Sequence, residues 1–379
     1  KIAIIGAGPA GLSCAYFLAR LGYRPVVFES ESCAGGMLTQ TIPSYRMPRN
    51  ITEREIRMIE GMGVDILTGK KLGRDFSLSS LRDEGYEAVF IGIGAPTGIC
   101  LQIPGADSGA DGITDAMKFL RDYNLKGTAK VGKKAVVVGG GNAAIDAART
   151  AVRMGADVTV IYRRTREEMP AWKEEIDEAL REGVRLKTLT NPEQIITTDG
   201  KVTGVKCTVM KLGEFDRSGR RRPEKTEENF IIAADQVIWA CGQTLDCTDL
   251  LDAPGIEMND GTWIKTDRVT GQTSVPWLFA GGDASTGPMS VVDAIAGGER
   301  AAVGIDQYLT GEDHAFWRTE KPVDTVFDPD ADPASYPRKE PVCIPVERRK
   351  GNFNEVERPW IEAETIRQAL RCLRCDYGK

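Results

Sequence analysis

The feature that most constrains this chain of 379 residues is a glycine-rich turn close to its start. Residues 2–5 read Ile-Ala-Ile-Ile, an apolar run typical of a buried parallel strand. Gly6-x-Gly8-x-x-Gly11 follows directly, and a helical pattern runs from position 9 to about position 21. A strand, a tight glycine turn and a helix in this order predict the first half of a β-α-β unit.

Each position of this turn has a physical role in binding a dinucleotide. Gly6 permits the tight turn, Gly8 lets a pyrophosphate approach the backbone, and Gly11 lets the helix pack closely on the strand. Pro9 costs little in a first helical turn, because its missing N–H would be unpaired there. With Ala10, these residues form a helix N-terminus, which binds phosphate groups well.

An acidic residue stands where a ribose partner is expected. The next predicted strand, 25–28, ends at Glu29, eighteen residues after Gly11. A carboxylate there would accept hydrogen bonds from the ribose hydroxyls. A glycine-rich turn without a ligand is the alternative, and the combination of strand, helix and distal carboxylate weighs strongly against it.

A second turn of the same kind lies in the middle of the chain. It joins a predicted strand, 134–138, to a predicted helix, 142–154, and alanine takes the third position, as the pattern permits. The sequence therefore predicts a second nucleotide site, with these contact residues: Gly139, Gly141, Asn142, Ala143 and Ala144.

The second turn lacks the acidic residue that follows the first. Arg163 and Arg164 stand at that place, nineteen and twenty residues after Ala144. A guanidinium pairs with a 2′-phosphate, which a carboxylate would repel, so the sequence favours NADP(H) over NAD(H). The alternative is a solvated surface pair, and Arg166 is open to either interpretation.

Two nucleotide sites in one chain imply two cofactors. A nicotinamide that comes and goes needs a second, resident redox group, and a flavin is the economical choice. The chain contains a single histidine, His314, so acid–base chemistry based on histidine is nearly excluded.

Composition excludes several other classes of protein. With 41% apolar residues the chain is not disordered, and with a net charge of −6 it has no dominant basic surface for nucleic acid. No apolar run reaches the length of about 20 residues that spans a membrane. Nine cysteines, most of them isolated in apolar segments, are typical of a reducing cytoplasm and not of a disulfide framework.

A later segment resembles a known superfamily. Residues 275–283 read Val-Pro-Trp-Leu-Phe-Ala-Gly-Gly-Asp, and a helical pattern follows over 291–302. This resembles the third flavin-binding segment of the two-dinucleotide-domain flavoproteins, in which the aspartate binds the ribityl chain and the helix directs its N-terminus at the pyrimidine ring. The resemblance implies FAD contacts at Gly282, Asp283, Val291 and Val292.

More narrowly, the chain resembles the small subunit of glutamate synthase and its relatives, among them the large subunit of the NADH-dependent ferredoxin:NADP oxidoreductase. The segments that carry the resemblance are Gly35-Gly36-Met37-Leu38, Ile42-Pro43-x-Tyr45-Arg46-x-Pro48, 53–63, Ile103-Pro104-Gly105, Tyr162-Arg163-Arg164, Met169-Pro170-Ala171 and Gly242-Gln243. The resemblance implies further flavin contacts at Gly35, Gly36, Met37 and Gly94, and a nicotinamide-side contact at Gly242.

The implied architecture is α/β, with two Rossmann-like dinucleotide-binding domains. The NAD(P)H domain, 106–245, is inserted in an FAD domain made of 1–105 and 246–312. Residues 313–379 form an arm in which prolines recur and which ends in Cys372-x-x-Cys375.

The implied activity is hydride transfer between NAD(P)H and FAD, with single electrons exchanged with an iron–sulfur protein or subunit of a larger complex. The relatives carry an iron–sulfur domain before the first glycine turn, whereas this sequence begins at Lys1 without a methionine, which predicts that residues are missing before it and leaves the electron acceptor open. Two alternatives stay open: a disulfide reductase of the same fold, which needs a cysteine pair beside the flavin, and a non-catalytic flavin-containing scaffold subunit.

Four local predictions remain. Cys372 and Cys375 have the spacing of two ligands of one metal site, and we interpret them as half of an iron–sulfur site; free thiols and zinc are the alternatives. A hairpin is predicted to turn at Asp199-Gly200, and residues 213–229 are predicted to form a charged loop, solvated or in contact with an acidic partner. A helix is predicted over 113–123.

Overall fold

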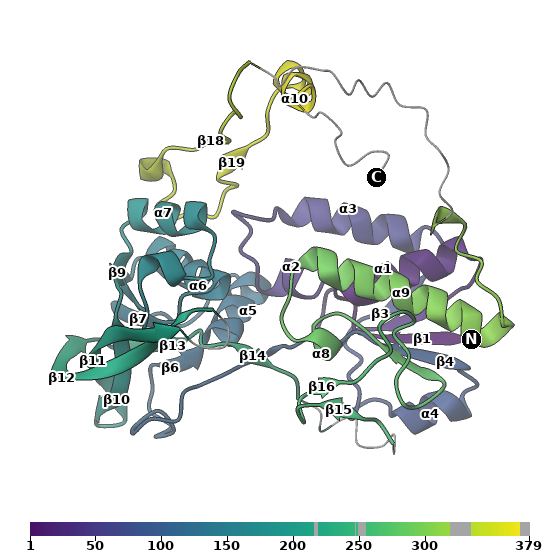
Figure 1. Cartoon of the computed structure of the whole chain (residues 1–379), viewed down its shortest axis with the longest axis horizontal. Coiled ribbons are helices and arrows are strands. Elements are labelled where there is room, and N and C mark those ends of the chain that lie inside the picture. Colours follow the sequence, from purple (N-terminus) through teal and green to yellow (C-terminus); the bar gives the residue numbers. More distant parts are fainter. Residues whose placement is uncertain (216–218, 247, 249–254, 319–334, 372–379) are drawn as a thin grey trace.

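Two parallel five-stranded sheets form the centre of the protein (Figure 1). The computed structural model describes residues 1–215, 219–246, 248, 255–318 and 335–371. In the first sheet the strand order is β17-β4-β1-β2-β3, and every neighbouring pair is parallel. Its strands are β1 (Ile2–Ile5), β2 (Val26–Phe28), β3 (Asp65–Leu67), β4 (Ala88–Ile91) and β17 (Leu278–Ala280).

Alternate residues of these strands face two apolar layers. On one face, Ile2 and Ile4 pack with α1 (Pro9–Arg20), α3 (Arg49–Glu60) and α9 (Val291–Thr310), which lie together in Figure 1. On the other face, Ala3 and Ile5 pack against α4 (Leu78–Asp83) and β16 (Trp263–Ile264). Burial on both faces explains why the strands are continuously apolar.

The second sheet repeats this plan. Its order is β6-β13-β7-β8-β9, again parallel throughout, and β7 lies at its centre as β1 does in the first sheet. The strands are β6 (Ile113–Asp115), β7 (Lys134–Val138), β8 (Asp157–Ile161), β9 (Arg185–Lys187) and β13 (Gln236–Trp239). One face is covered by α5 (Ala116–Lys126), α6 (Asn142–Arg153) and α7 (Lys173–Arg181).

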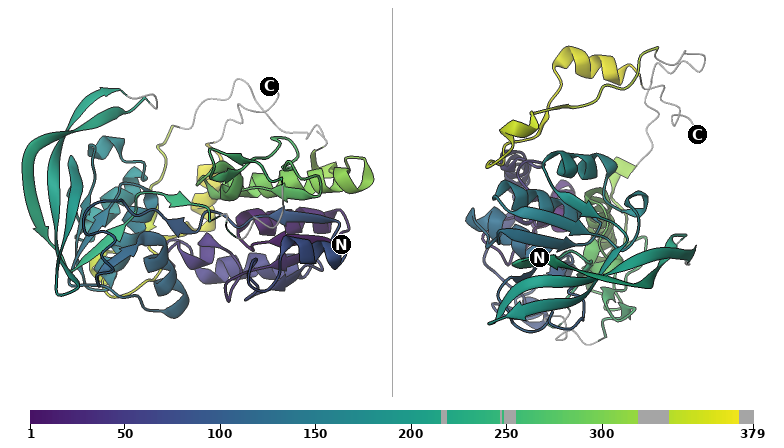
Figure 2. Two further views of the ribbon diagram at one scale, coloured as in Figure 1. Left: turned by 90° about the horizontal axis from the view of Figure 1, so that it is seen from below. Right: turned by 90° about the vertical axis from the view of Figure 1, so that its left-hand side faces the viewer.

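An antiparallel sheet covers the other face of the second parallel sheet. It consists of β10 (Thr190–Thr198), β11 (Lys201–Phe215) and β12 (Arg221–Ala233), the long ribbons in the left view of Figure 2. The turn predicted at Asp199-Gly200 is confirmed, since both residues have positive φ, 50° and 71°. The prediction of a charged loop over 213–229 is wrong, because 221–233 form an edge strand that pairs with β11.

The predicted helix over 113–123 is also wrong at its start. Ile113 and Thr114, both β-branched, form the edge strand β6 beside β13. Asp115 caps the following helix, since its carboxylate accepts a hydrogen bond of 3.0 Å from the backbone N–H of Lys118. The helix therefore begins at Ala116.

Short elements connect the two halves and form the arm. They are α2 (Met37–Gln40), β5 (Thr97–Gly98), η1 (Arg166–Glu168), β14 (Gln243–Thr244), β15 (Met258–Asn259), α8 (Asp283–Thr286), η3 (Phe316–Arg318), β18 (Val342–Cys343), η4 (Val346–Arg348), β19 (Glu357–Arg358) and α10 (Glu362–Ala369). In Figure 1 the arm passes over α7, and α10 stands away from both sheets. Within the described residues, no helix has the length and apolar character needed to cross a bilayer.

Candidate functional site

The first glycine turn lies at the carboxyl edge of the first sheet, between β1 and α1. Gly6 has a φ of 98°, and a Cβ atom there would lie 2.6 Å from the carbonyl oxygen of Gly92. At Gly11 a Cβ atom would lie 1.9 Å from the carbonyl oxygen of Gly6. The fold itself therefore requires glycine at these two positions.

Gly8 differs, because the fold does not require it to be glycine. Its φ is −79° and its ψ is −178°, extended backbone that any residue adopts. The nearest atom to a Cβ there would be the Cα of Gly36, at 3.8 Å, an ordinary contact. The space in front of Gly8 is therefore free for a ligand that approaches the backbone, as a pyrophosphate does.

The segment Gly35-Gly36, for which the resemblance implies flavin contacts, lies beside this turn. The backbone N–H of Gly35 donates to the carbonyl of Ala7 at 2.8 Å, and a Cβ on Gly36 would lie 2.7 Å from the Cα of Gly8. Met37 turns toward the other half of the molecule and packs against the apolar core beneath α6. The geometry thus favours Gly35 and Gly36 as flavin neighbours over Met37.

Glu29 lies at the end of β2, only 5% exposed. Its carboxylate accepts hydrogen bonds from the backbone N–H of Ala7 at 2.8 Å and of Glu31 at 2.9 Å. Ser30 Oγ donates a third hydrogen bond to it, of 3.3 Å. A carboxylate offers about four acceptor positions, so these three bonds orient it and leave one for a ribose hydroxyl. The structure therefore brings Glu29 to the glycine turn itself.

The third flavin-type segment closes the same edge of the sheet. A Cβ on Gly282 would lie 2.9 Å from the Cβ of Ala10, so residues 272 positions apart in the chain meet here. Asp283 accepts a hydrogen bond of 3.1 Å from the backbone N–H of Met289, and burial raises the pKa of its carboxyl group. The loop after β17 is thereby held against the first turn of α1.

The N-terminus of α9 presents apolar side chains to solvent. Val291 is 38% and Val292 is 73% exposed, while Ser290 and Asp293 form a capping box that fixes the start of the helix. Gly94, beyond the end of β4, has a φ of 68° and nothing within 4 Å of a Cβ position. Apolar residues exposed at a helix N-terminus suit a flat ring system that gains negative charge.

The second glycine turn, like the first, has one position where the fold requires glycine and one where it does not. Gly139 has a φ of 147°, and a Cβ there would lie 2.3 Å from the carbonyl oxygen of Ala240. Gly141 has a φ of −89°, and its nearest neighbour would be the Cγ of Pro170, at 4.0 Å. Gly141 thus corresponds to Gly8 in leaving space for a phosphate.

A loop that the sequence analysis gave no role lies against this second turn. The backbone N–H of Ala171 donates to the carbonyl of Gly140 at 3.0 Å, and that of Trp172 donates to Oδ1 of Asn142 at 3.1 Å. The Trp172 side chain is 67% exposed at the mouth of the turn. The signal in the sequence that could have identified this loop was Met169-Pro170-Ala171, one of the segments that carry the family resemblance. Ala143 is half-buried, and Ala144 is fully buried against the strand below.

The two arginines after β8 take different positions. Arg164 is 4% exposed, and its Nε donates to the backbone carbonyl of Arg221 in β12 at 2.8 Å. Arg163 is exposed. Burial raises the pKa of the Cys241 thiol to about 11, and the positive charge of Arg163 opposes that rise. Arg163, two residues after the end of β8, is thus exposed with its charge acting on the thiol next to Gly242 in the chain, whereas Arg164 is turned into the structure.

The cysteines of the described chain do not form a reactive pair. All six are unpaired: Cys14, Cys33, Cys100, Cys207, Cys241 and Cys343. Burial raises the pKa of each thiol, whereas a reactive thiol has a lowered pKa. Among the described residues no three metal-ligating side chains gather, and Cys372 and Cys375 lie outside those residues.

The fold and the two turns define a class of protein, and comparison with known proteins identifies the family. The chain belongs to the pyridine nucleotide-disulphide oxidoreductase family, whose model matches residues 1–298. It is therefore an oxidoreductase of a family that binds FAD and NADPH. Its fold is similar to that of FprA from Mycobacterium tuberculosis in complex with NADPH, with a TM-score of 0.70, 20% identity, and coverage of 82% of this chain and 84% of that one.

Two curated relatives narrow the position of the chain within this family. It is 44% identical over 388 residues to the NADP(+)-dependent formate dehydrogenase subunit beta of Moorella thermoacetica, covering 99% of this chain and 54% of the relative. It is 39% identical over 326 residues to the glutamate synthase [NADPH] small chain of Escherichia coli, covering 82% and 68%. The resemblance to the glutamate synthase small subunit is thereby confirmed, and the chain spans about half the length of the first relative.

Proposed function

We propose that this chain is an electron-transfer flavoprotein subunit of a larger redox complex. FAD binds at the turn Gly6–Gly11, NADPH binds at the turn 139–144, and single electrons are exchanged with an iron–sulfur protein or subunit. The observation that carries the proposal is the free space at Gly8 and Gly141, two glycines that neither backbone conformation nor packing requires. The names of the relatives, a subunit beta and a small chain, support a role within a complex.

The contribution of the polypeptide is to bind and orient the two cofactors. FAD supplies the chemistry, since a flavin accepts a hydride and releases single electrons. In this proposal Glu29 and Asp283 hold the flavin nucleotide, and Gly141 and Arg163 hold the nicotinamide nucleotide. The only histidine, His314, pairs with Asp306 near the end of α9, with 2.9 Å between Nδ1 and Oδ2, and no step requires it.

The disulfide reductase alternative receives no support from the described residues. Cys33, close to the first glycine turn, donates a long hydrogen bond of 4.0 Å to Thr39, and burial raises its pKa. A dithiol that exchanges electrons with flavin needs a partner and an accessible thiolate. The unpaired cysteines are consistent with a reducing cytoplasm, which we propose as the location.

The purified chain is expected to carry FAD without a covalent bond and to lose its flavin colour rapidly when NADPH is added without oxygen. Anaerobic titration should take up about two electrons per flavin, the capacity of one FAD. Uptake of four electrons with a thiolate-to-flavin charge-transfer band would instead indicate a disulfide reductase. A flavin that NADPH does not reduce would indicate the scaffold subunit.

The two C-terminal cysteines lead to a second prediction, which concerns a metal site. We propose that Cys372 and Cys375 contribute two ligands to an iron–sulfur cluster completed by other sequence or a partner. Replacing both by serine in the intact complex should lower its iron content and slow electron transfer to the partner. Loss of zinc in place of iron would indicate a zinc site, and unchanged metal content with unchanged transfer would indicate free thiols.

A further inference from the structure

The segment Ile42–Pro48 carries part of the family resemblance, but none of the residues assigned above to the two nucleotide sites lies in it. It follows α2 and precedes α3 in the first half of the molecule. Tyr45 is only 1% exposed. Its ring lies 4.7 Å from the guanidinium carbon of Arg149 and 4.1 Å from that of Arg153, both on α6 of the other half. An aromatic ring of one nucleotide domain is thus buried beneath two cations of the other.

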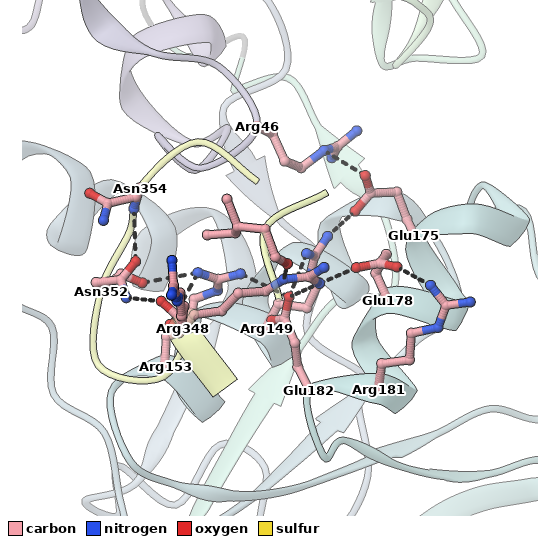
Figure 3. Close-up of polar contacts among 12 residues, drawn as sticks. Arg46, Arg149, Arg153, Glu175, Glu178, Arg181, Glu182, Arg348, Asn352 and Asn354 are labelled. Atoms are coloured by element: carbon pink, nitrogen blue, oxygen red, sulfur yellow. Dashed lines mark hydrogen bonds and ion pairs between the residues drawn. The ribbon is translucent and has the colours of Figure 1, made fainter. Parts of the chain in front are cut away.

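Arg46 extends the contact to a second pair of groups. Its Nη1 donates to both carboxylate oxygens of Asp146 on α6, each at 2.9 Å. Its Nε lies 3.4 Å from Glu175 on α7, the contact of Arg46 that Figure 3 draws. Asp146 is 5% exposed. Charge-assisted hydrogen bonds in a buried setting are directional, so this pair restricts both distance and rotation between the two domains.

The arm closes over the same place. The backbone N–H of Val356 donates to the carbonyl of Tyr45 at 3.0 Å, and Ser44 Oγ donates to the carbonyl of Phe353 at 3.2 Å. The Phe353 ring stacks on Tyr123 of α5, with 4.2 Å between ring centroids. One short stretch of the arm therefore contacts the first domain through residues 44–45 and the second domain through α5.

A buried ionic cluster fastens the arm to the second domain (Figure 3). Glu182 accepts hydrogen bonds from Arg149 at 2.6 Å, from Arg153 at 2.8 Å and from Arg349 of the arm at 3.1 Å. Arg349 also pairs with Glu178. Within the structure four arginines face four carboxylates, and the exposed Arg181 adds a fifth cation to Glu178 at 2.6 Å. The buried part is thus balanced in charge, and removal of one of its members leaves a buried charge uncompensated. The members are Arg46, Arg149, Arg153 and Arg349 with Asp146, Glu175, Glu178 and Glu182.

Only a few residues of chain separate these contacts from the two glycine turns. Asp146 lies on the first turns of α6, five residues after Gly141. Arg46 lies ten residues after Gly36, which touches Gly8 of the first turn. A displacement between Arg46 and Asp146 would therefore be transmitted directly to the distance between the two nucleotide sites.

We infer that Tyr45 and Arg46 are positioning residues for hydride transfer: they hold α6, and with it the nicotinamide nucleotide site, in one fixed orientation toward the flavin site, and the arm residues 344–356 secure this contact. The inference rests on the proposed function. Hydride transfer needs donor and acceptor atoms at about 3–3.5 Å, and a misplacement of about 1 Å can slow a reaction about a hundredfold. The contact lies outside both glycine turns, so its loss should change the rate of transfer and leave cofactor binding intact.

The variant Arg46→Gln tests this inference, and Arg54→Gln is the matched control. Arg54 is an exposed arginine on neighbouring α3, and among the contacts described it pairs only with the adjacent Glu55. Arg46→Gln should retain full FAD content and bind NADPH within about threefold of the unaltered chain. The rate of flavin reduction at saturating NADPH, measured by stopped flow, should fall at least about tenfold. Arg46→Lys should restore part of that rate, and Arg54→Gln should change nothing.

A double-variant cycle separates positioning from a general loss of stability. Asp146→Asn should slow flavin reduction as Arg46→Gln does, and the double variant should be no slower than either single variant. Additive losses, or equal losses in dithionite reduction, would overturn the inference. An unaltered chain whose flavin NADPH fails to reduce would overturn the proposed function instead, so the two failures are distinguishable.

A pH profile of the unaltered chain provides a test that needs no variant. Burial raises the pKa of the Asp146 carboxyl group to about 6. The positive charges of Arg46 and Arg149 oppose this rise, and the negative charge of Glu175 adds to it. Because this pKa lies above the ordinary value of 3.8, the folded state binds the proton more tightly than the unfolded state does. Acidification therefore removes the ion pair, and protonation of Asp146 does not lower the free energy of unfolding. Flavin reduction should slow as pH falls from 7.5 to 5.0, and Asp146→Asn should lack that transition. A transition that persists unchanged in Asp146→Asn would contradict the inference.

Discussion

Valine in place of Gly8 is expected to give a folded chain that binds no FAD. The backbone at this position has a negative φ, and outside the adjoining residues the nearest atom to a Cβ would be the Cα of Gly36, at 3.8 Å, so the fold accommodates a Cβ atom there. The methyl groups of the valine would occupy the space through which a pyrophosphate reaches the backbone of the turn. FAD affinity should fall at least about a hundredfold, which corresponds to about 2.7 kcal/mol. Flavin absorbance of the purified chain and equilibrium titration with FAD measure the effect.

The reciprocal substitution, Gly141→Val, makes the assignment of the two sites testable. This variant should purify with FAD and be reduced by dithionite, yet NADPH should no longer reduce its flavin. Gly61→Ala is the control, since Gly61 is exposed, has a φ of −61° and lies outside both turns. If Gly141→Val lost FAD while Gly8→Val retained it, the two cofactors would have to be exchanged between the sites.

Local sequence patterns were sufficient to predict the elements that carry the two turns. The strand expected over 134–138 coincides with β7, and both helices begin where the glycine pattern places them, at positions 9 and 142. These elements are predictable because their signals are local: an apolar run, a turn that only glycine can form, and a helix directly after it. The two five-stranded sheets confirm the predicted fold class. The limits proposed for the domains stay a prediction.

The elements that were missed depend on contacts between distant residues. The strand β12 has six charged residues among its 13, and its apolar residues do not alternate with polar ones. Its pairing with β11 supplies the order that its own sequence does not indicate. The arm had the composition of an extended segment, but nothing in it predicts that Arg349 meets Glu178 on α7. Tyr45 and Arg46 were likewise visible only as part of a resemblance, because their partners lie a hundred residues away on α6.

The side-chain positions of the arginines after β8 could likewise not be predicted from the sequence. These positions lead to a second prediction, a large effect on NADPH binding. The sequence offered Arg163 and Arg164 as an equivalent pair. In the structure the guanidinium of Arg164 is buried and bonded to the backbone of β12, whereas Arg163 is exposed. Only an accessible guanidinium can pair with a phosphate that arrives and leaves with its nucleotide, so the discrimination of NADPH from NADH should depend on Arg163.

Arg163→Ala is therefore expected to weaken NADPH binding about tenfold or more and to leave NADH binding unchanged. A hydrogen bond to a charged group contributes about 1.5–3 kcal/mol, which supports a loss of that size. Arg164→Ala should lower the melting temperature, because it removes a buried contact to β12, and should affect both nucleotides equally. Arg166→Ala serves as the control, since Arg166 pairs with Asp177 on α7. Titration of each variant with both nucleotides, followed by flavin reduction, distinguishes these results; equal losses for NADPH and NADH in Arg163→Ala would mean that Arg163 does not bind the phosphate.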